Sequence, residues 1–121
     1  MKVIISISDE MADYEALKSF CDEKLKNLGV QEIFSDIDKE NGKNLRRYIQ
    51  ERGYKFIFFA TEKDKSTLSV VKKNTKMTRQ ADVLIISPKD KIRKENLILY
   101  AKRNGLLIWE MKNKQAKIDK D

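Results

Sequence analysis

Five short apolar runs alternate with four longer segments of helical spacing, and this alternation constrains the fold more than any other feature of the chain. The runs are rich in β-branched and aromatic residues, which favours strands. They cover Lys2–Ser8, Gln31–Ser35, Tyr54–Ala60, Asp82–Ser87 and Leu106–Met111. Strands that alternate with helices are joined by right-handed crossovers into a parallel sheet. The pattern therefore predicts an α/β fold: a three-layer Rossmann-like sandwich with a five-stranded parallel sheet in the order 3-2-1-4-5.

The segments between the runs carry the apolar stripes of amphipathic helices. In the first, one stripe comprises Tyr14, Leu17, Cys21, Leu25 and Leu28. Cys21 lies in the middle of this stripe, so we expect it to pack in the core and not to act as a nucleophile.

The other three helices are predicted from their stripes and their caps. The second is marked by Leu45, Tyr48 and Ile49. The third starts at Ser66, and its expected inward residues are Leu68, Val71 and Met77. The last is predicted to be capped by Asp90 and to bury Leu97, Ile98 and Ala101.

Three of the four glycines follow predicted helices, where a positive φ ends the helix at little cost. These helix-stop glycines are Gly29, Gly53 and Gly105. None of the turns that lead from a strand into a helix is closed by a glycine. In an open α/β sheet those turns form the ligand crevice, and glycines there let the backbone approach a phosphate. The chain thus has the pattern of a nucleotide-binding scaffold without the usual phosphate loops.

The 121 residues predict one Rossmann-like domain over residues 1–111, followed by a flexible basic tail over 112–121. No apolar run is long enough for a membrane span, and no export signal opens the chain. The single cysteine excludes an internal disulfide, and together with the absent signal it predicts a cytoplasmic location. The absence of histidine disfavours zinc and triad chemistry. We expect no cofactor and no metal; the acidic residues Asp36, Asp38 and Glu40 leave Mg²⁺ as a weak alternative.

The net charge of +7 is concentrated in the second half of the chain. Residues 1–60 hold 10 Lys and Arg against 11 Asp and Glu, whereas residues 61–121 hold 16 against 8. An excess of this kind indicates an anionic partner, although a solvated lysine-rich surface explains it as well. The two densest clusters are Lys72, Lys73, Asn74, Thr75, Lys76 and Arg79, and Lys89, Lys91, Arg93 and Lys94.

The segment Lys73–Ile86, KNTKMTRQADVLII, resembles the SLOG superfamily, and more narrowly its small stand-alone YspA-like Rossmannoid domains. Those domains carry a basic residue followed by Asn, then Met, then Ala-Asp before an apolar strand, at the spacing found here. The opening KVIISISDEMADYEAL and the ending AKRNGL are similar to the same family. The resemblance implies a crevice that binds nucleotides or nucleotide-derived ligands, and in some relatives cleavage of N-glycosidic bonds.

Carried over residue by residue, the resemblance implies a ligand site at the carboxyl ends of the first and fourth strands. The candidate ligand-binding residues are Ser6, Ser8, Asp9, Lys73, Asn74, Met77, Ser87, Arg93 and Lys94. The chain departs from the family at Ile7, where relatives have glycine, and at Asp9, where they often have arginine.

The second loop, Ser35–Gly42, is acidic where the family is rich in glycine. Its Asp36, Asp38 and Glu40 would repel a phosphate unless a metal or Lys39 intervened. Arg93 and Lys94 offer side-chain contacts to an anion instead of backbone amides.

These observations predict a non-catalytic domain that binds or senses a nucleotide-type small molecule. One alternative is a nucleic-acid-associated or phage-type accessory protein that uses the basic half. Another is an N-glycosidic hydrolase or deoxyribosyltransferase-like enzyme with Glu95 as the carboxylate, although Glu95 lacks a second glutamate. A fourth is an adaptor that has lost its ligand and works through a protein surface. Trp109 in the last strand is predicted to pack at a sheet edge, which leaves a homodimer open.

Overall fold

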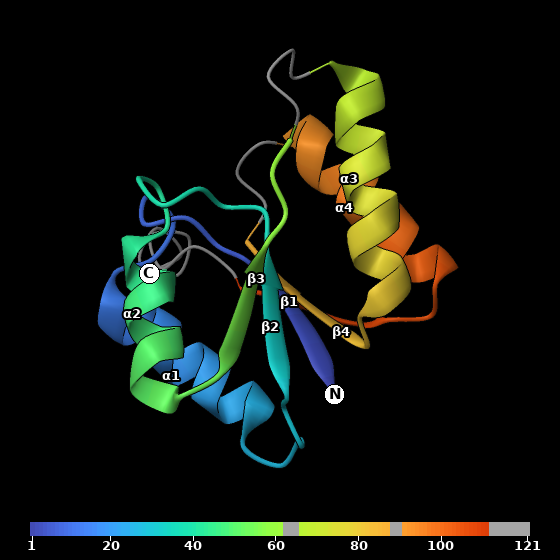
Figure 1. Cartoon of the computed structure of the whole chain (residues 1–121). Helices are drawn as coiled ribbons and strands as arrows, with labels where there is room; N and C mark the ends of the chain where they lie inside the picture. The colour runs from blue at the N-terminus through green and yellow to red at the C-terminus, as the bar shows by residue number, and fades with distance from the viewer. Residues whose placement is uncertain (62–65, 88–90, 112–121) are drawn as a thin grey trace, which may run out of the picture.

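In the computed structural model, five parallel strands form one sheet in the order β3-β2-β1-β4-β5, as the sequence predicts (Figure 1). The structure describes residues 1–61, 66–87 and 91–111, with the side chains of 91–94 outside the description. The strands are β1 (Lys2–Ser6), β2 (Glu32–Ser35), β3 (Lys55–Phe58), β4 (Val83–Ile86) and β5 (Leu107–Glu110). The order reverses between β1 and β4, and this switch point is where open α/β sheets bind ligands.

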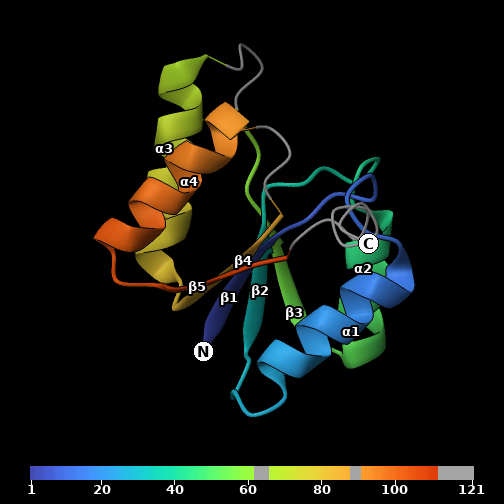
Figure 2. The ribbon, with the colours of Figure 1, turned by 180° about the vertical axis from the view of Figure 1, so that it is seen from behind.

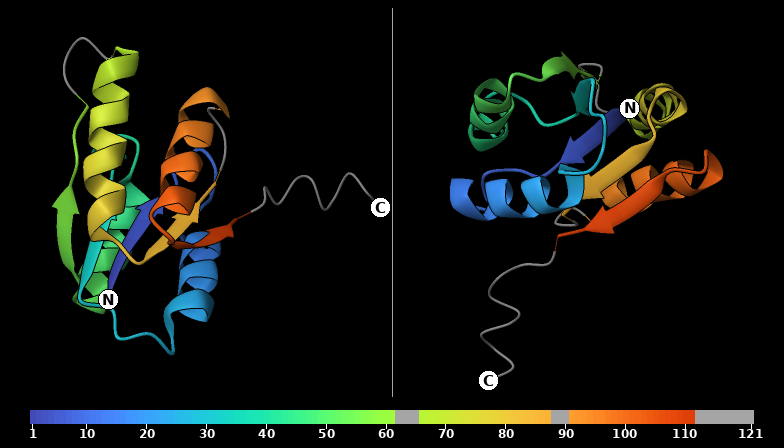
Figure 3. Two further views of the ribbon diagram at one scale, coloured as in Figure 1. Left: turned by 90° about the vertical axis from the view of Figure 1, so that its right-hand side faces the viewer. Right: turned by 90° about the horizontal axis from the view of Figure 1, so that it is seen from below.

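Four helices alternate with the strands: α1 (Tyr14–Leu25), α2 (Lys43–Arg52), α3 (Thr67–Gln80) and α4 (Lys91–Arg103). Figure 2 and the view from below in Figure 3 show α1 and α2 on one side of the sheet, with α3 and α4 on the other. The caps follow ordinary rules: the Asp13 carboxylate accepts from the Ala16 amide, and the Ser66 hydroxyl accepts from the Ser69 amide. The predicted cap Asp90 and the predicted flexible tail 112–121 lie outside the described residues.

Alternation along each strand separates the core into two clusters, one on each face of the sheet. Val3, Ile5 and Ile85 lie in the cluster that also contains Leu17, Cys21 and Tyr48 from α1 and α2. The second cluster covers the opposite face and comprises Ile4, Phe34, Met77, Leu84, Ile86, Leu97, Ala101 and Leu106. Cys21 is fully buried, as predicted, and burial raises the pKa of its thiol to about 12. At neutral pH it is therefore a packed thiol.

Two of the three predicted helix-stop glycines have the expected conformation. Gly53 and Gly105 have φ of +72° and +74°, and both follow directly after helical segments. Gly29 is not such a stop, because α1 already ends at Leu25. The chain then forms a turn before it reaches Gly29. The prediction for the inward face of α3 is also partly wrong. Leu68 is 63% exposed, since the Ser66 cap and the packing of Val70 and Met77 set the phase of the helix.

The last edge strand, β5, packs Trp109 against the α1 side of the core, with the Lys24 ammonium 5.5 Å from the ring centroid. This agrees with its predicted packing role. Among the described residues, no helix is long and apolar enough to cross a membrane.

Candidate functional site

Strand register and alternation bring Ser6 and Asp36 together at the switch point. Ile4 of β1 pairs with Phe34 of β2, so two residues further along Ser6 lies beside Asp36. Ile4 and Phe34 both belong to the cluster on the α3 and α4 face, and side chains two residues apart share a face. Ser6 and Asp36 are therefore turned toward α3. The Ser6 hydroxyl donates to the Asp36 carboxylate across 2.7 Å.

Lys73 completes this arrangement from α3. Its ammonium Nζ lies 3.0 Å from Asp36 Oδ2, and the side chains of the two residues are only 8% and 13% exposed. Removing two opposite charges from water is costly unless the pair is tightly matched. Ser6, Asp36 and Lys73 therefore form a hydrogen-bonded cluster, to which β1, the end of β2 and α3 each contribute one residue.

The cluster corrects how the acidic loop was expected to be neutralised. Sequence reasoning offered a metal or Lys39 as the counter-charge, but the partner of Asp36 is Lys73, and Lys39 is exposed. Asp38 turns away to its own loop, where its carboxylate accepts from the Asn41 amide at 2.9 Å, and this bond lowers the pKa of Asp38. Among the described residues, no three acidic, histidine or cysteine side chains gather as a metal site would require.

The Asp9 side chain has a structural role, which is to cap the start of α2. Its carboxylate accepts from the backbone amides of Lys43 and Asn44 at 3.1 and 2.9 Å, which are the first amides of α2. The N-cap position of α2 is Gly42, which has no side chain to do this. A Cβ at Gly42 would lie 2.6 Å from Arg46 Nη1 and 2.9 Å from Ile37 Cγ2, so close packing excludes a side chain there. Asp9 supplies the missing cap from another loop.

Asn74 occupies a polar seam between α3 and α4. Its Nδ2 donates to Asn96 Oδ1 at 2.9 Å, and the Asn104 amide donates to the Thr78 hydroxyl at 3.2 Å. Asn74 is 1% exposed, and its Oδ1 has no hydrogen-bond partner among the residues that the structure describes. A buried carbonyl without a donor is costly, so this atom marks a place where a ligand or water with an N–H or O–H group would be favoured.

Of the other predicted site residues, Ser8 and Ser87 lie near the carboxyl ends of β1 and β4, and Met77 lies in the core. Ser87 is buried at the end of β4, and its backbone amide donates to the Ser6 carbonyl at 3.3 Å. Ser8 is half-buried in the loop after β1. Met77 is fully buried in the core, where packing accounts for it. The Arg93 and Lys94 side chains lie outside the described residues, and Glu95 is exposed on α4.

Sequence reasoning missed Asn96, although a signal was present. Asn96 and Tyr100 on α4 and Asn104 just after it recur every four residues, and Asn74 and Thr78 have the same spacing on α3. Matching polar stripes on two helices of one layer indicate a hydrogen-bonded seam.

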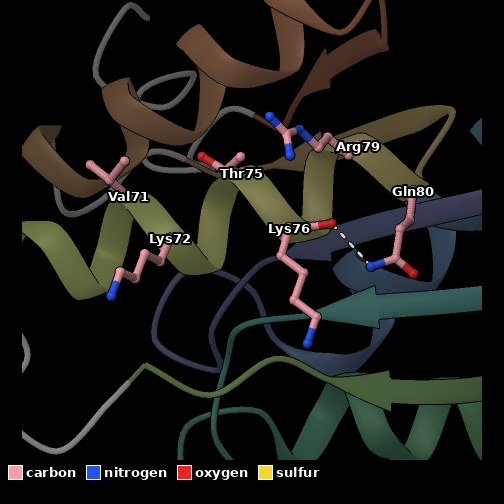
Figure 4. Close-up of a pocket in the computed structure, with 6 residues that line it drawn as sticks. All are labelled: Val71, Lys72, Thr75, Lys76, Arg79 and Gln80. Carbon is pink, nitrogen blue, oxygen red and sulfur yellow. Dashed lines mark hydrogen bonds between the residues drawn. The ribbon is translucent and has the colours of Figure 1, made fainter.

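A basic groove of about 410 Å³ runs along the outer face of α3 (Figure 4). Its lining residues are Val71, Lys72, Thr75, Lys76, Arg79 and Gln80. The three cationic side chains are exposed and take part in no ion pair among the described residues. A second groove, of about 480 Å³, lies beside α1 and α2. It is lined by Asp22, Glu23, Leu25, Lys26, Arg52 and Tyr54, and there Asp22 and Arg52 form an ion pair.

No protein-family model matches the chain, and no curated protein or solved structure matches it either. The SLOG resemblance therefore stays a prediction from the motifs.

Proposed function

We propose that this domain binds a nucleotide-type small molecule in the crevice at the carboxyl ends of β1 and β4, without converting it. The observation that carries the proposal is the convergence of Ser6, Asp36 and Lys73 from three elements at the switch point. Buried charge is expensive, and such groups gather where a protein recognises or transforms a ligand.

The position of Asp36 suits a contact between its carboxylate and the sugar hydroxyls of a nucleotide. Asp36 directly follows β2, and dinucleotide-binding α/β folds place an acidic residue on the hydroxyls of the ribose. A carboxylate offers about four acceptor sites and an ammonium three donors, so each can bind a ligand beside its partner. Lys73 would then contact a ligand oxygen by its side chain, in place of the glycine-lined backbone that the loops lack.

Asn74 supports the same proposal from the neighbouring position of α3. Its unpartnered Oδ1 is an acceptor for a base N–H or a sugar hydroxyl. Binding without catalysis agrees with the chemistry available. The chain has no histidine, the Cys21 thiol is buried, and Glu95 stands on α4 without a second glutamate. The resemblance to the SLOG superfamily also supports the proposal, because it implies a crevice that binds nucleotide-derived ligands.

The test is a thermal-shift screen of the full chain against nucleoside mono-, di- and triphosphates, cyclic nucleotides, NAD and ADP-ribose, at 0.1 and 0.5 M KCl. A compound at 100 times its Kd adds about 2.7 kcal/mol, which raises the Tm by roughly 10 °C. We expect such a shift from one ligand class, equal at both salt concentrations.

Two variants assign the shift to the crevice. Asp36→Asn is expected to abolish it, whereas Asp38→Asn, which changes the next carboxylate in the same loop, should retain it. Asn74→Ala provides a second crevice variant in case Asp36→Asn folds poorly. The proposal is wrong if no compound shifts the Tm, or if Asp36→Asn and Asn74→Ala respond as the wild type does.

A further inference from the structure

The outer face of α3 is strongly cationic. Helix α3 contains Lys72, Lys73, Lys76 and Arg79 and no acidic residue between Thr67 and Gln80. Lys73 turns inward to Asp36, which leaves the other three along the groove. Figure 4 shows Lys72 and Lys76 directed to one side of the helix and Arg79 to the other. The groove therefore presents positive charge along both of its sides.

From this arrangement we propose that α3 docks on the sugar-phosphate backbone of duplex nucleic acid, independently of sequence. Lys72 and Lys76 are four residues apart, which spaces them by about 6 Å along the helix. Thr75 and Gln80 add a hydroxyl and an amide, which are common donors to phosphate and sugar oxygens. The net charge of +7 attracts a polyanion from a distance as well.

The lining distinguishes a duplex backbone from the other polyanions. Single-strand binders stack bases on aromatic side chains, and none of the six lining residues is aromatic. Acidic protein partners are anchored by large side chains in a pocket, and the groove offers only Val71 as an apolar side chain. A phosphate backbone needs neither, because charge neutralisation and counterion release supply most of its affinity.

The salt dependence of duplex binding measures the number of phosphates that are neutralised. Each contact contributes about −0.9 to the slope of log K against log salt, so three cations contribute about −2.7. Between 50 and 200 mM salt this corresponds to a loss of roughly 40-fold in affinity.

The experiment is fluorescence anisotropy of a labelled 20-bp duplex with the full chain at 50, 100 and 200 mM KCl. Lys72→Gln/Lys76→Gln/Arg79→Gln is expected to flatten the slope by about 2.7 relative to the wild type. The matched control is Lys26→Gln/Lys39→Gln/Lys43→Gln, which removes the same charge from exposed lysines next to α1 and α2. It should retain the wild-type slope. Circular dichroism and Tm show that both variants are folded.

Competing ligands decide between the classes of partner. Polyglutamate and phosphatidylserine vesicles should bind more weakly than the duplex, and a single strand should bind no more tightly. An equal loss of slope in the control variant, tighter binding to any of these competitors, or no duplex binding at 50 mM would overturn the proposal. The crevice is tested separately, because the α3 triple variant should keep the thermal shift of the wild type.

Discussion

The two helix layers are held together by different chemistry. Between α1 and α2 the contacts are charged and aromatic. The Tyr48 hydroxyl and the Arg52 guanidinium both donate to the Asp22 carboxylate, at 2.8 Å from Tyr48 Oη and 2.9 Å from Arg52 Nε. Tyr14 donates to Glu51, and the Arg47 guanidinium stacks 3.8 Å from the centroid of the Tyr14 ring. Between α3 and the described side chains of α4 and Asn104, the polar contacts are uncharged amides and a hydroxyl, centred on Asn74 and Thr78.

The two layers differ in how completely their polar and charged groups are paired, and both proposals above place recognition on the less completely paired layer. In the α1 and α2 layer the interhelical charges are matched, and the core cluster beneath them is the larger of the two. The α3 and α4 layer has a buried carbonyl without a partner, an exposed Leu68 and three cations outside any described ion pair. Departures from good packing and pairing concentrate where a protein meets its ligands. If the two proposals hold, the α1 and α2 layer mainly stabilises the sheet and the α3 and α4 layer meets the ligands.

The strongest test of this division is Tyr48→Ala in the α1 and α2 layer. Tyr48 is fully buried and is one of the largest side chains in the core. Its truncation leaves a cavity and removes one of the donors to Asp22, so urea unfolding should show a loss of about 4 kcal/mol. Tyr48→Phe keeps the ring and loses only the hydroxyl bond, for about 1 kcal/mol. Equal losses for the two substitutions would show that hydrogen bonding, not packing, stabilises this layer.

The next test breaks the charge pair that joins α3 to the crevice. Lys73→Met keeps the length and apolar volume of the side chain but leaves the Asp36 carboxylate buried beside Ser6. Removing one partner of a buried pair should destabilise the chain by about 3 kcal/mol in urea unfolding at pH 7.

Adding Asp36→Asn to Lys73→Met is expected to recover most of that loss, because an uncharged amide still accepts from the Ser6 hydroxyl. The double variant should nevertheless fail to bind the crevice ligand. If Lys73→Met costs no stability, the pair contributes nothing to the fold. A double variant that is less stable than Lys73→Met would show that Asp36 and Lys73 act on stability independently.

The order of the strands in the sheet could be predicted from the sequence. The side-chain contacts between residues far apart in the chain could not. The order of the strands, the burial of Cys21 and the ends of two helices at Gly53 and Gly105 were predicted correctly, since each depends on a local pattern. The cap of α2 by Asp9 and the ion pair of Asp36 with Lys73 join residues 34 to 37 positions apart. Such contacts depend on the register of β1 against β2, which no local pattern specifies.

The phase of α3 was missed for a related reason. An apolar stripe through Leu68, Val71 and Met77 fits the sequence, but of these only Met77 is buried. The helix turns Val70, Asn74 and Thr78 inward instead of Leu68 and Val71. A buried Asn and Thr pair with polar residues of α4, so the true inward face is partly polar. Hydrophobic periodicity cannot find a face of this kind.

The smallest predicted effect is a pH dependence carried by Asp22. Its hydrogen bond with the Arg52 guanidinium, aided by the Tyr48 hydroxyl, lowers the pKa of Asp22 below its value in the unfolded chain. The stability that this supplies is complete above the unfolded pKa, near 3.9, and is lost as the pH falls through the folded value. Because the Asp22 side chain is 38% exposed, solvent screens the pair, and Asp22→Asn should cost no more than about 1 kcal/mol at pH 7.

The measurement is urea unfolding of wild type and Asp22→Asn at pH 7 and pH 2.5, followed by Trp109 fluorescence. The difference in the free energy of unfolding between the two proteins should shrink at pH 2.5, because the stability supplied by the lowered pKa of Asp22 is lost as the pH falls below the unfolded pKa. Glu23→Gln is the matched control, since it removes an exposed carboxylate of α1 that forms no described ion pair. A difference that stays constant from pH 7 to pH 2.5 would mean that Asp22 links α1 to α2 by shape and not by charge. The contrast between the two helix layers would then rest on the aromatic contacts of Tyr14 and Tyr48 alone.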